Sequence, residues 1–213
     1  EAFGGEVIFV DDGPPNSGEP VVRDVERIRD LQPPDPHENR ALRRTLDVID
    51  GLRAHGDPGV PILGVVISPF SLPVMQLGFP AYLDLLHERP DLVHHLLAVN
   101  EEFCVAWGNA QFAAGVTALT YFDPLASPTN VTPAMYRELG KPVARRVLSR
   151  LQGPVAAHLA SGRVLGVVDD LVELGVAGVG AGDVEDAAAV KDACRGRVTM
   201  IGNLNGIAMA NWS

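Results

Sequence analysis

From about residue 60 onward, short apolar runs alternate with amphipathic segments, and this alternation constrains the fold more than any other feature. Five of the runs are apolar without strict alternation, and the first of them is also rich in β-branched residues, which is typical of strands buried on both faces. The segments between them carry apolar residues at helical spacing. A parallel sheet covered by helices is therefore predicted. The predicted strands are residues 61–67, 117–123, 154–160, 176–181 and 198–203.

The predicted helices fill the intervals between these strands. Gly115 is a suitable C-cap for the longest of them, and Thr132 with Pro133 forms a suitable start for the next. Residues 1–35 are rich in turn formers, above all in the stretch "DDGPPNSGEP", and predict an irregular lead-in with an exposed loop. The predicted helices are residues 37–55, 91–115, 132–151, 164–175 and 184–194.

Two architectures place helices on a parallel sheet: an open doubly wound sheet and a (β/α)8 barrel. No predicted strand is followed by GxGxxG or a phosphate-loop lysine motif, and the glycines of "GVGAGD" at 178–183 lie within and just after a strand. The barrel is therefore favoured. Barrel domains run to about 250 residues, and this chain of 213 residues begins without methionine. We expect residues 1–213 to form a single barrel domain that lacks its terminal strands.

Composition excludes several classes of partner. Apolar residues make up 46% of the chain and charged residues 21%, the balance of a globular protein. The net charge of −10 repels phosphate backbones, so nucleic acid is not an expected partner. No apolar run reaches the ~20 residues of a membrane span, and no signal peptide opens the chain. Two cysteines without metal-site spacing favour a reducing, cytoplasmic location.

Polar side chains gather where the predicted strands end. Active sites in both architectures lie at the carboxyl ends of parallel strands, so this convergence predicts a site. The candidates are Ser68 and Phe70 after the first strand, Tyr121, Asp123 and Ser127 after the second, His158 and Ser161 after the third, Asp183 after the fourth, and Asn203 and Asn205 after the fifth.

Each candidate also has a purely structural explanation. Asp123 precedes a proline and could organise a turn, and Tyr121 could be a core aromatic residue. Asp183 stands where a helix N-cap is wanted, so capping is its expected role. A lone histidine such as His158 is more often a satisfied core residue. A strand-end position facing a wet cavity would avoid the cost of burying an unpaired imidazole, and His158 is therefore predicted to be functional.

Several segments resemble the uroporphyrinogen decarboxylase superfamily in order and spacing. They are "PFSLPVMQLGF", "YFDPLASPTNVTPAMYRELGKPV", "PVAAHLASG", "LVELGVAGVGAGD" and "VTMIGNLN", and the similarity runs from about Gly5 to the last residue. The resemblance implies a (β/α)8 barrel that is longer at both ends. It also implies one of two activities. These are the cofactor-free decarboxylation of uroporphyrinogen and the transfer of a methyl group between a substrate, a corrinoid and a thiol.

The stretch "FDPLASPTNVTPAMYRE" is more similar to the methyltransferase branch. The decarboxylases tend to have Asp-Ser in place of Asp123-Pro124, and "GNLDP" in place of "GNLN". A methyltransferase-like enzyme acting on a small molecule with a separate corrinoid protein is therefore the leading hypothesis. A uroporphyrinogen decarboxylase and a degenerate, non-catalytic ligand-binding barrel are the alternatives. In an enzyme, His158, Asp123 and Tyr121 would be catalytic, and Ser68, Phe70, Ser127, Ser161, Asn203 and Asn205 would bind substrate.

The resemblance also bears on zinc. Many methyltransferases of that branch bind zinc with a His-x-Cys pair at this strand end and a later cysteine. His158 falls on the histidine, but Ala160 stands at the cysteine. A methyl group cannot ligate a metal, so no tightly bound zinc is expected. In that case His158 would move a proton near neutral pH, Asp123 would hold a cationic or hydrogen-bonding group, and Tyr121 would donate to an oxygen.

Overall fold

The computed structural model describes residues 1–11, 13 and 15–211, apart from the side chain of Ile207. Residues 12 and 14, which belong to the predicted exposed loop, lie outside the described residues. The lead-in is not wholly irregular. A short antiparallel pair, β1 (Val7–Ile8) and β2 (Asn16–Ser17), is followed by the 3-10 helix η1 (Val25–Asp30), whose Ile28 is fully buried.

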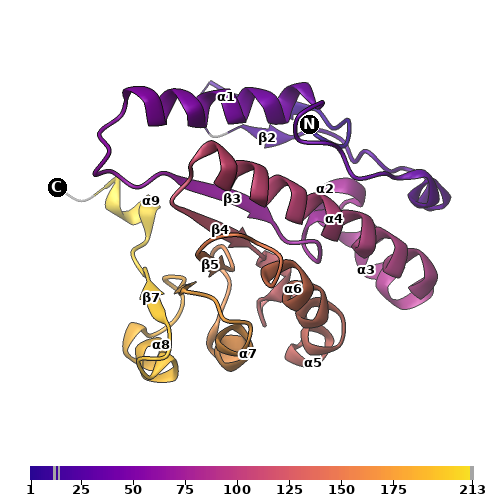
Figure 1. The fold of residues 1–213 in the computed structure, drawn as a ribbon. Coiled ribbons are helices and arrows are strands. Elements are labelled where there is room, and N and C mark those ends of the chain that lie inside the picture. Colours follow the sequence, from indigo (N-terminus) through magenta and orange to yellow (C-terminus); the bar gives the residue numbers. More distant parts are fainter. Residues whose placement is uncertain (12, 14, 212–213) are drawn as a thin grey trace.

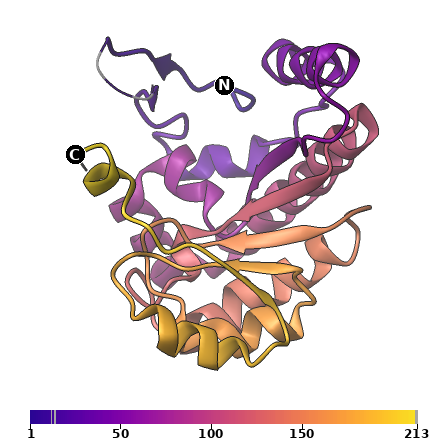
Figure 2. The ribbon, with the colours of Figure 1, turned by 90° about the vertical axis from the view of Figure 1, so that its left-hand side faces the viewer.

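A parallel sheet of five strands forms the centre of the molecule (Figure 1). The strands neighbour one another in chain order, and the colours of Figure 2 follow that order across the sheet. A doubly wound sheet would reverse its strand order at a switch point, whereas this order is that of a (β/α)8 barrel. The predicted partial barrel is confirmed. The strands are β3 (Leu63–Ile67), β4 (Ala118–Phe122), β5 (Val155–His158), β6 (Gly178–Gly180) and β7 (Thr199–Ile201).

The two faces of the sheet have different environments. On β4, Leu119 and Tyr121 are buried with Val66 of β3 in the core between the sheet and the helices. We call this side the outer face. Thr120 and Phe122 alternate with them and are only half-buried. They lie on the inner face, which is the side that lines a closed barrel.

Two predicted helices are confirmed in kind, with small shifts at their ends. The long helix α4 (Pro90–Ala114) ends at Gly115, which has a φ of 109° and donates its N–H to two carbonyls of the last turn. Helix α1 (Arg40–His55) begins three residues later than predicted, because Asn39 caps it and accepts from two backbone N–H groups. None of the described helices is long and apolar enough to cross a bilayer.

The predicted helix over residues 132–151 is helical from Pro133 to Leu148, but it is not a regular α-helix throughout. It consists of α5 (Pro133–Met135), a π-helical turn η3 (Tyr136–Gly140) and α6 (Lys141–Leu148). Pro142 has no N–H to donate to the preceding turn, so a regular α-helical ladder cannot run through this point. The predicted cap at Thr132 is present, since its side chain accepts from the N–H of Met135.

Two further helices are shorter than predicted, and one capping prediction was wrong. Residues 165–173 form the 3-10 helix η4 (Leu165–Val167) followed by α7 (Val168–Glu173). Helix α8 (Ala187–Cys194) is capped by Asp186, not by Asp183. The chain makes another turn after β6 before the helix starts, so Asp183 falls too early.

Beyond the lead-in, sequence reasoning missed four more elements among the described residues. Helices α2 (Leu72–Leu77) and α3 (Phe79–Glu88) are separated by Gly78, whose φ of 86° breaks the helical pattern between them. The other two are the 3-10 turn η2 (Pro124–Ala126) and the terminal helix α9 (Gly206–Met209). Their few residues give too short a periodic signal to be recognised.

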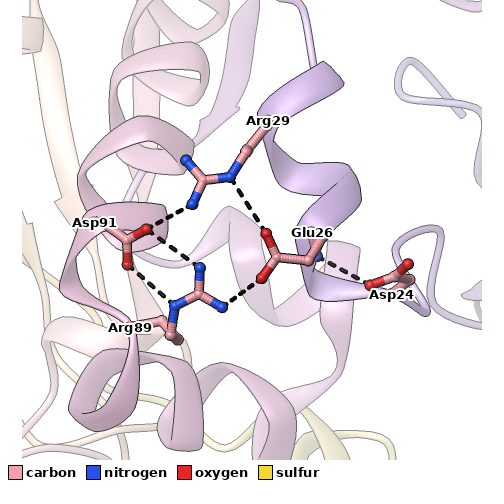
Figure 3. Close-up of polar contacts among 5 residues, drawn as sticks. All are labelled: Asp24, Glu26, Arg29, Arg89 and Asp91. Carbon is pink, nitrogen blue, oxygen red and sulfur yellow. Dashed lines mark hydrogen bonds and ion pairs between the residues drawn. The ribbon is translucent and has the colours of Figure 1, made fainter.

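An exposed ion cluster fastens η1 to the start of α4 (Figure 3). Arg89 donates to Glu26 and, with two nitrogens, to both oxygens of Asp91 at 3.2 Å. Arg29 donates to Asp91 at 2.8 Å and to Glu26 at 3.3 Å. Asp24 caps η1 by accepting from the N–H of Glu26 at 3.0 Å. The hydrogen bonds of Arg89 lower the pKa of Asp91 to about 2.

Arg89→Ala is expected to loosen the lead-in. Glu26, Arg29 and Asp91 are exposed and Arg89 is half-buried, so we expect a small drop in the thermal midpoint at low salt. The drop should vanish in about 1 M salt, where the Debye length is about 3 Å. Arg27→Ala is the matched control, because Arg27 makes a single 3.6 Å pair with Asp30 between side chains 75% and 74% exposed. Thermal unfolding at both salt concentrations measures the effect, and equal drops in the two variants would contradict it.

Candidate active site

The register of the sheet places His158 in one row of side chains on the inner face. Ile67, Phe122, His158, Gly180 and Ile201 are successive Cα partners across β3 to β7. Partners in a ladder point to the same face. His158 is therefore the ionisable group of this row, with an aromatic ring on one side and a glycine on the other.

The His158 ring is half-buried. Its centroid lies 5.6 Å from that of Phe122, with the two rings inclined at 55°. Burial lowers the pKa of His158. The neutral imidazole is therefore favoured near pH 7, and it offers one acceptor and one donor nitrogen.

The next row toward the amino ends of the strands is small or apolar. Its residues are Val65, Thr120, Ala156, Gly178 and Thr199, again successive Cα partners. Val65 is 51% exposed and Thr199 is also exposed, and both lie on the outermost strands of the sheet; between them Thr120 and Ala156 are half-buried and Gly178 is buried. The inner face thus carries one imidazole next to a row of small or apolar side chains.

Asp123 lies elsewhere, inside the loops that follow β3 and β4. Its side chain is 1% exposed, and its Oδ1 accepts from the hydroxyls of Ser68 and Ser71, each at 2.6 Å. The Ser71 hydroxyl also accepts from the N–H of Leu125 at 2.9 Å. The structure therefore unites Asp123 with Ser68, as parts of a buried hydrogen-bond cluster that does not open in front of His158.

The second Asp123 oxygen, Oδ2, is buried and has no hydrogen-bond partner among the described residues. Burial raises the pKa of Asp123 to about 6, although the two serine hydroxyls and the N–H of Ala126 oppose this rise. Burial, reinforced by the Asp123 charge, also raises the pKa of Tyr121 and Tyr136. These tyrosines are therefore neutral at any physiological pH.

Tyr121 and Phe70 both pack in the core. Tyr121 is 2% exposed on the outer face, the opposite side of the sheet from His158. Phe70 is fully buried, with its ring centroid 6.5 Å from that of Tyr82 and 6.3 Å from that of Tyr136. Neither side chain is open to a substrate in this structure, so the predicted roles of both lack support from their positions.

Ser127 ties the loop after β4 to the loop after β5. It is fully buried, and its hydroxyl donates to the carbonyl of Arg163 at 2.8 Å. Thr129 completes the tie by accepting from the N–H of Arg163 at 3.1 Å. Ser161 is exposed at the tip of the loop after β5. Of these two predicted substrate ligands, Ser161 is therefore the one open to solvent.

Glu185 and Asn203 tie the next loops together. The buried Glu185 carboxylate accepts from the N–H groups of Val164 and Leu165 at 2.6 and 3.0 Å. Asn203 donates to the carbonyls of Gly182 and Glu185 at 3.2 and 2.8 Å.

Asn205 acts in the same way further along the chain. Its Oδ1 caps α9 by accepting from Ala208, and its amide donates to Asp183. The polar groups of Asn203 and Asn205 thus serve the loops themselves.

Sequence reasoning missed Phe122, Gly180, Ser71 and Glu185. Alternation indicates that Phe122 and Tyr121 cannot both line the site, because neighbouring residues of one strand point to opposite faces, but it does not say which of them does. Gly180 carried a weaker signal, a glycine inside a strand. Nothing in the sequence pairs Ser71 with Asp123 or Glu185 with Val164, because these contacts join loops distant in the chain.

The residues present do not fit a zinc ion. No group of three or more His, Cys, Asp or Glu side chains among the described residues could hold a metal. Ala160, at the position where the resemblance would put a cysteine, has a φ of 54° in the turn after β5. Cys104 and Cys194 are both buried and lie in helices α4 and α8.

Comparisons with known proteins place this geometry in context. The family model for uroporphyrinogen decarboxylase (URO-D) matches residues 1–212. A uroporphyrinogen decarboxylase from Xanthomonas euvesicatoria pv. vesicatoria is 31% identical over 216 residues, which cover 96% of this chain and 60% of that protein. One from Azoarcus sp. is 31% identical over 157 residues, or 71% of this chain and 42% of that protein.

A solved structure, a methyltransferase from Methanosarcina mazei, is similar in fold. The TM-score is 0.85 at 23% sequence identity, with 95% of this chain and 60% of that one covered. This likeness concerns the fold alone. The chain spans 60% of the length of the Xanthomonas relative and of this methyltransferase.

Asp123→Asn is expected to flatten the pH dependence of stability in mildly acidic solution. The folded-state pKa of Asp123, about 6, lies above its usual value of 3.8. The folded protein therefore binds a proton more tightly, and this stabilisation is complete below pH 3.8 and lost as the pH rises to about 6. Each unit of difference corresponds to about 1.4 kcal/mol.

Urea unfolding midpoints measured across this pH window test the prediction. The asparagine retains an oxygen for Ser68 and Ser71 but removes the titration, so the difference between variant and wild type should vary with pH. Asp123→Ala is the control, because it deprives both serine hydroxyls of their acceptor, at a cost of about 1–3 kcal/mol each. A wild type and an asparagine variant with the same pH slope would contradict the prediction.

Purified wild-type protein is expected to contain far less than stoichiometric zinc. Ala160→Cys supplies a thiolate two residues from His158 and should raise zinc affinity only if a third ligand is present. Elemental analysis of both proteins measures this. Stoichiometric zinc in the wild type that is lost in His158→Ala would show the prediction to be wrong.

Proposed function

Because this chain belongs to the uroporphyrinogen decarboxylase family, we propose that it is part of an enzyme that transfers a methyl group. The transfer would run between a small substrate or a thiol and a corrinoid carried by a separate protein. The observation that carries this proposal is the inner-face row, in which a half-buried imidazole stands beside apolar and small side chains.

The composition of the inner face favours a small, uncharged reacting group. The row of His158 contains Ile67, Phe122 and Ile201, and the row below it contains alanine and glycine at β5 and β6. A methyl group on oxygen, nitrogen or sulfur is compact and apolar, and it can lie against such a floor. The pairing of Asp123 with Pro124, in "FDPLASP", supports the same branch of the family.

His158 would act as the proton carrier of the reaction. Burial lowers its pKa, so its neutral ring can accept a proton from an incoming thiol at neutral pH. As sulfur attacks the methyl carbon of the donor, the S–H proton would pass to the imidazole, and the donor would keep the electron pair of the bond to the methyl group as that bond breaks. In the reverse direction the imidazolium returns the proton to the sulfur as the methyl group departs.

The corrinoid would be supplied by the partner protein, and it offers a metal centre that accepts and releases methyl groups. No residue of this chain is assigned to hold it. Because no metal-ligand group is found among the described residues, the proposal assigns no step to a metal-bound thiolate. The proton transfer by His158 would take the place of metal activation of the thiol.

A second candidate function is the decarboxylation of uroporphyrinogen. It is favoured by the names of relatives 30–31% identical to this chain, which are uroporphyrinogen decarboxylases. In that reaction His158 would stand near an acetate arm of a pyrrole ring, where CO2 leaves and a proton takes its place on the methylene carbon of the arm. The two candidates place the same imidazole at the reacting atoms, but they differ in substrate and product.

The full-length protein should transfer methyl groups from methylcobalamin to a small thiol such as coenzyme M. His158→Ala should reduce this rate by about 10²–10⁴-fold, the usual contribution of acid–base catalysis. His94→Ala is the control, because His94 is exposed on α4. Spectroscopic loss of methylcobalamin and detection of the thioether measure the reaction. Release of CO2 from uroporphyrinogen without methyl transfer would overturn the proposal and establish the second candidate.

A further inference from the structure

The His158 ring lies against the backbone of β6, where Gly180 is its Cα partner in the ladder. A Cβ atom placed on Gly180 would lie 2.5 Å from His158 Nδ1 and 3.3 Å from its Cγ. Carbon and nitrogen atoms that are not bonded do not approach so closely. Any side chain at this position would therefore force the imidazole to turn away from β6.

Phe122 limits the ring from the other side. It is the Cα partner of His158 on β4, and its ring centroid is 5.6 Å from that of the imidazole. The imidazole thus occupies a slot between an aromatic ring and a bare strand. A displaced imidazole cannot move toward β4 without meeting Phe122, so it would have to turn out of the slot.

Backbone conformation does not explain a glycine here. Gly180 is not among the described glycines with positive φ, and it lies in a regular parallel strand. Glycine within a strand weakens it and often marks a close approach by another group. The approaching group is the His158 ring, and the space that it uses is the reason for the missing side chain.

We infer that Gly180 is a positioning residue for His158. Because Gly180 has no Cβ, the imidazole can lie over β6 in the orientation that it has on the inner face. The inference rests on the proposed function for one point, that His158 is the reacting group. The orientation itself follows from the contact between the two residues. Gly180 does not touch substrate; it acts through the histidine.

Gly178 provides a matched control on the same strand. It also lies on the inner face, but a Cβ there would meet Ile201 Cδ1 at 2.9 Å and the Cβ of Ala156 at 3.3 Å, not His158. Gly178→Ala and Gly180→Ala therefore add the same methyl group to the same strand. Only Gly180→Ala should act on the imidazole.

The test uses the full-length protein with 13Cε1-labelled histidine. The His158 resonance is assigned as the one that His158→Ala removes. Gly180→Ala should shift this resonance and lower the melting temperature by on the order of 4 °C. Gly178→Ala should leave the resonance in place. An unmoved His158 resonance in Gly180→Ala would overturn the inference.

A double-mutant cycle tests the same contact through stability. If the added methyl group is destabilising because it meets the imidazole, its effect must disappear when His158 is alanine. The melting temperature of the double variant should then equal that of His158→Ala. An undiminished loss in the double variant would overturn the inference. If Gly180→Ala alone does not fold, recovery of folding in the double variant supports the inference, and failure to recover overturns it.

Turnover separates this inference from the proposed function. A shifted resonance together with a loss of methyl transfer supports both. A shifted resonance with unchanged transfer supports the positioning of His158 by Gly180 and removes His158 from the proposed reaction. A displaced imidazole should also change the pH profile of transfer, which a purely structural role of Gly180 would leave unaltered.

Discussion

The buried Asp123 carboxylate is the contact on which the carboxyl-end rim of this sheet depends. It holds the hydroxyls of Ser68 and Ser71 on a single oxygen, and so joins the loop after β3 to the loop after β4. From there the ties continue around the rim. Ser127 binds the loop after β5, Glu185 joins that loop to the one after β6, and Asn203 joins the latter to the end of β7. Successive strands are thus fastened to one another by side chains as well as by their ladder. A rim held in this way fixes the end of β5, where His158 lies.

Burying the Asp123 carboxyl group costs free energy, and the donors that it satisfies explain why it is buried. A carboxyl group that is fully buried without a cation is unfavourable in its charged form, and the raised pKa of Asp123 reflects this. Glu185 is used differently, because it accepts from two backbone N–H groups at the start of η4. Both carboxylates satisfy donors that would otherwise be orphaned in tight loops. Polar residues at strand ends can therefore serve loop geometry as well as catalysis.

The partial barrel was predictable because its strands are apolar on both faces and each strand pairs with the next one along the chain. The apolar character of both faces also means that the sequence does not show which residues of a strand point to the inner face. Tyr121 and Phe122 are equally compatible with a buried strand, and only the ladder with His158 shows that Phe122 is the inner-face residue. The irregular turn before Pro142 could have been predicted, because proline has no N–H to donate. The turn that moves the cap of α8 to Asp186 could not. Asp123 and Ser71 are 52 residues apart in the chain, so their hydrogen bond depends on the tertiary fold.

Two small residues, Ala160 and Gly180, bear on the role of His158 in the proposed reaction. Alanine at position 160 removes the thiolate that would share a metal with the imidazole, and the described residues hold no alternative set of ligands. Glycine at position 180 gives the ring room to lie over β6, against the backbone. A histidine that binds a metal must direct a nitrogen lone pair at the ion, whereas one that carries protons must keep a nitrogen open to the reacting group. In the proposed reaction the second role would fall to His158, whose half-buried ring lies beside Phe122 and Gly180 and whose pKa is lowered by burial. In the proposed reaction these two small residues would act together: without a thiolate at position 160 the imidazole would keep its nitrogens for the reacting group, and without a Cβ at position 180 it has room to lie against β6.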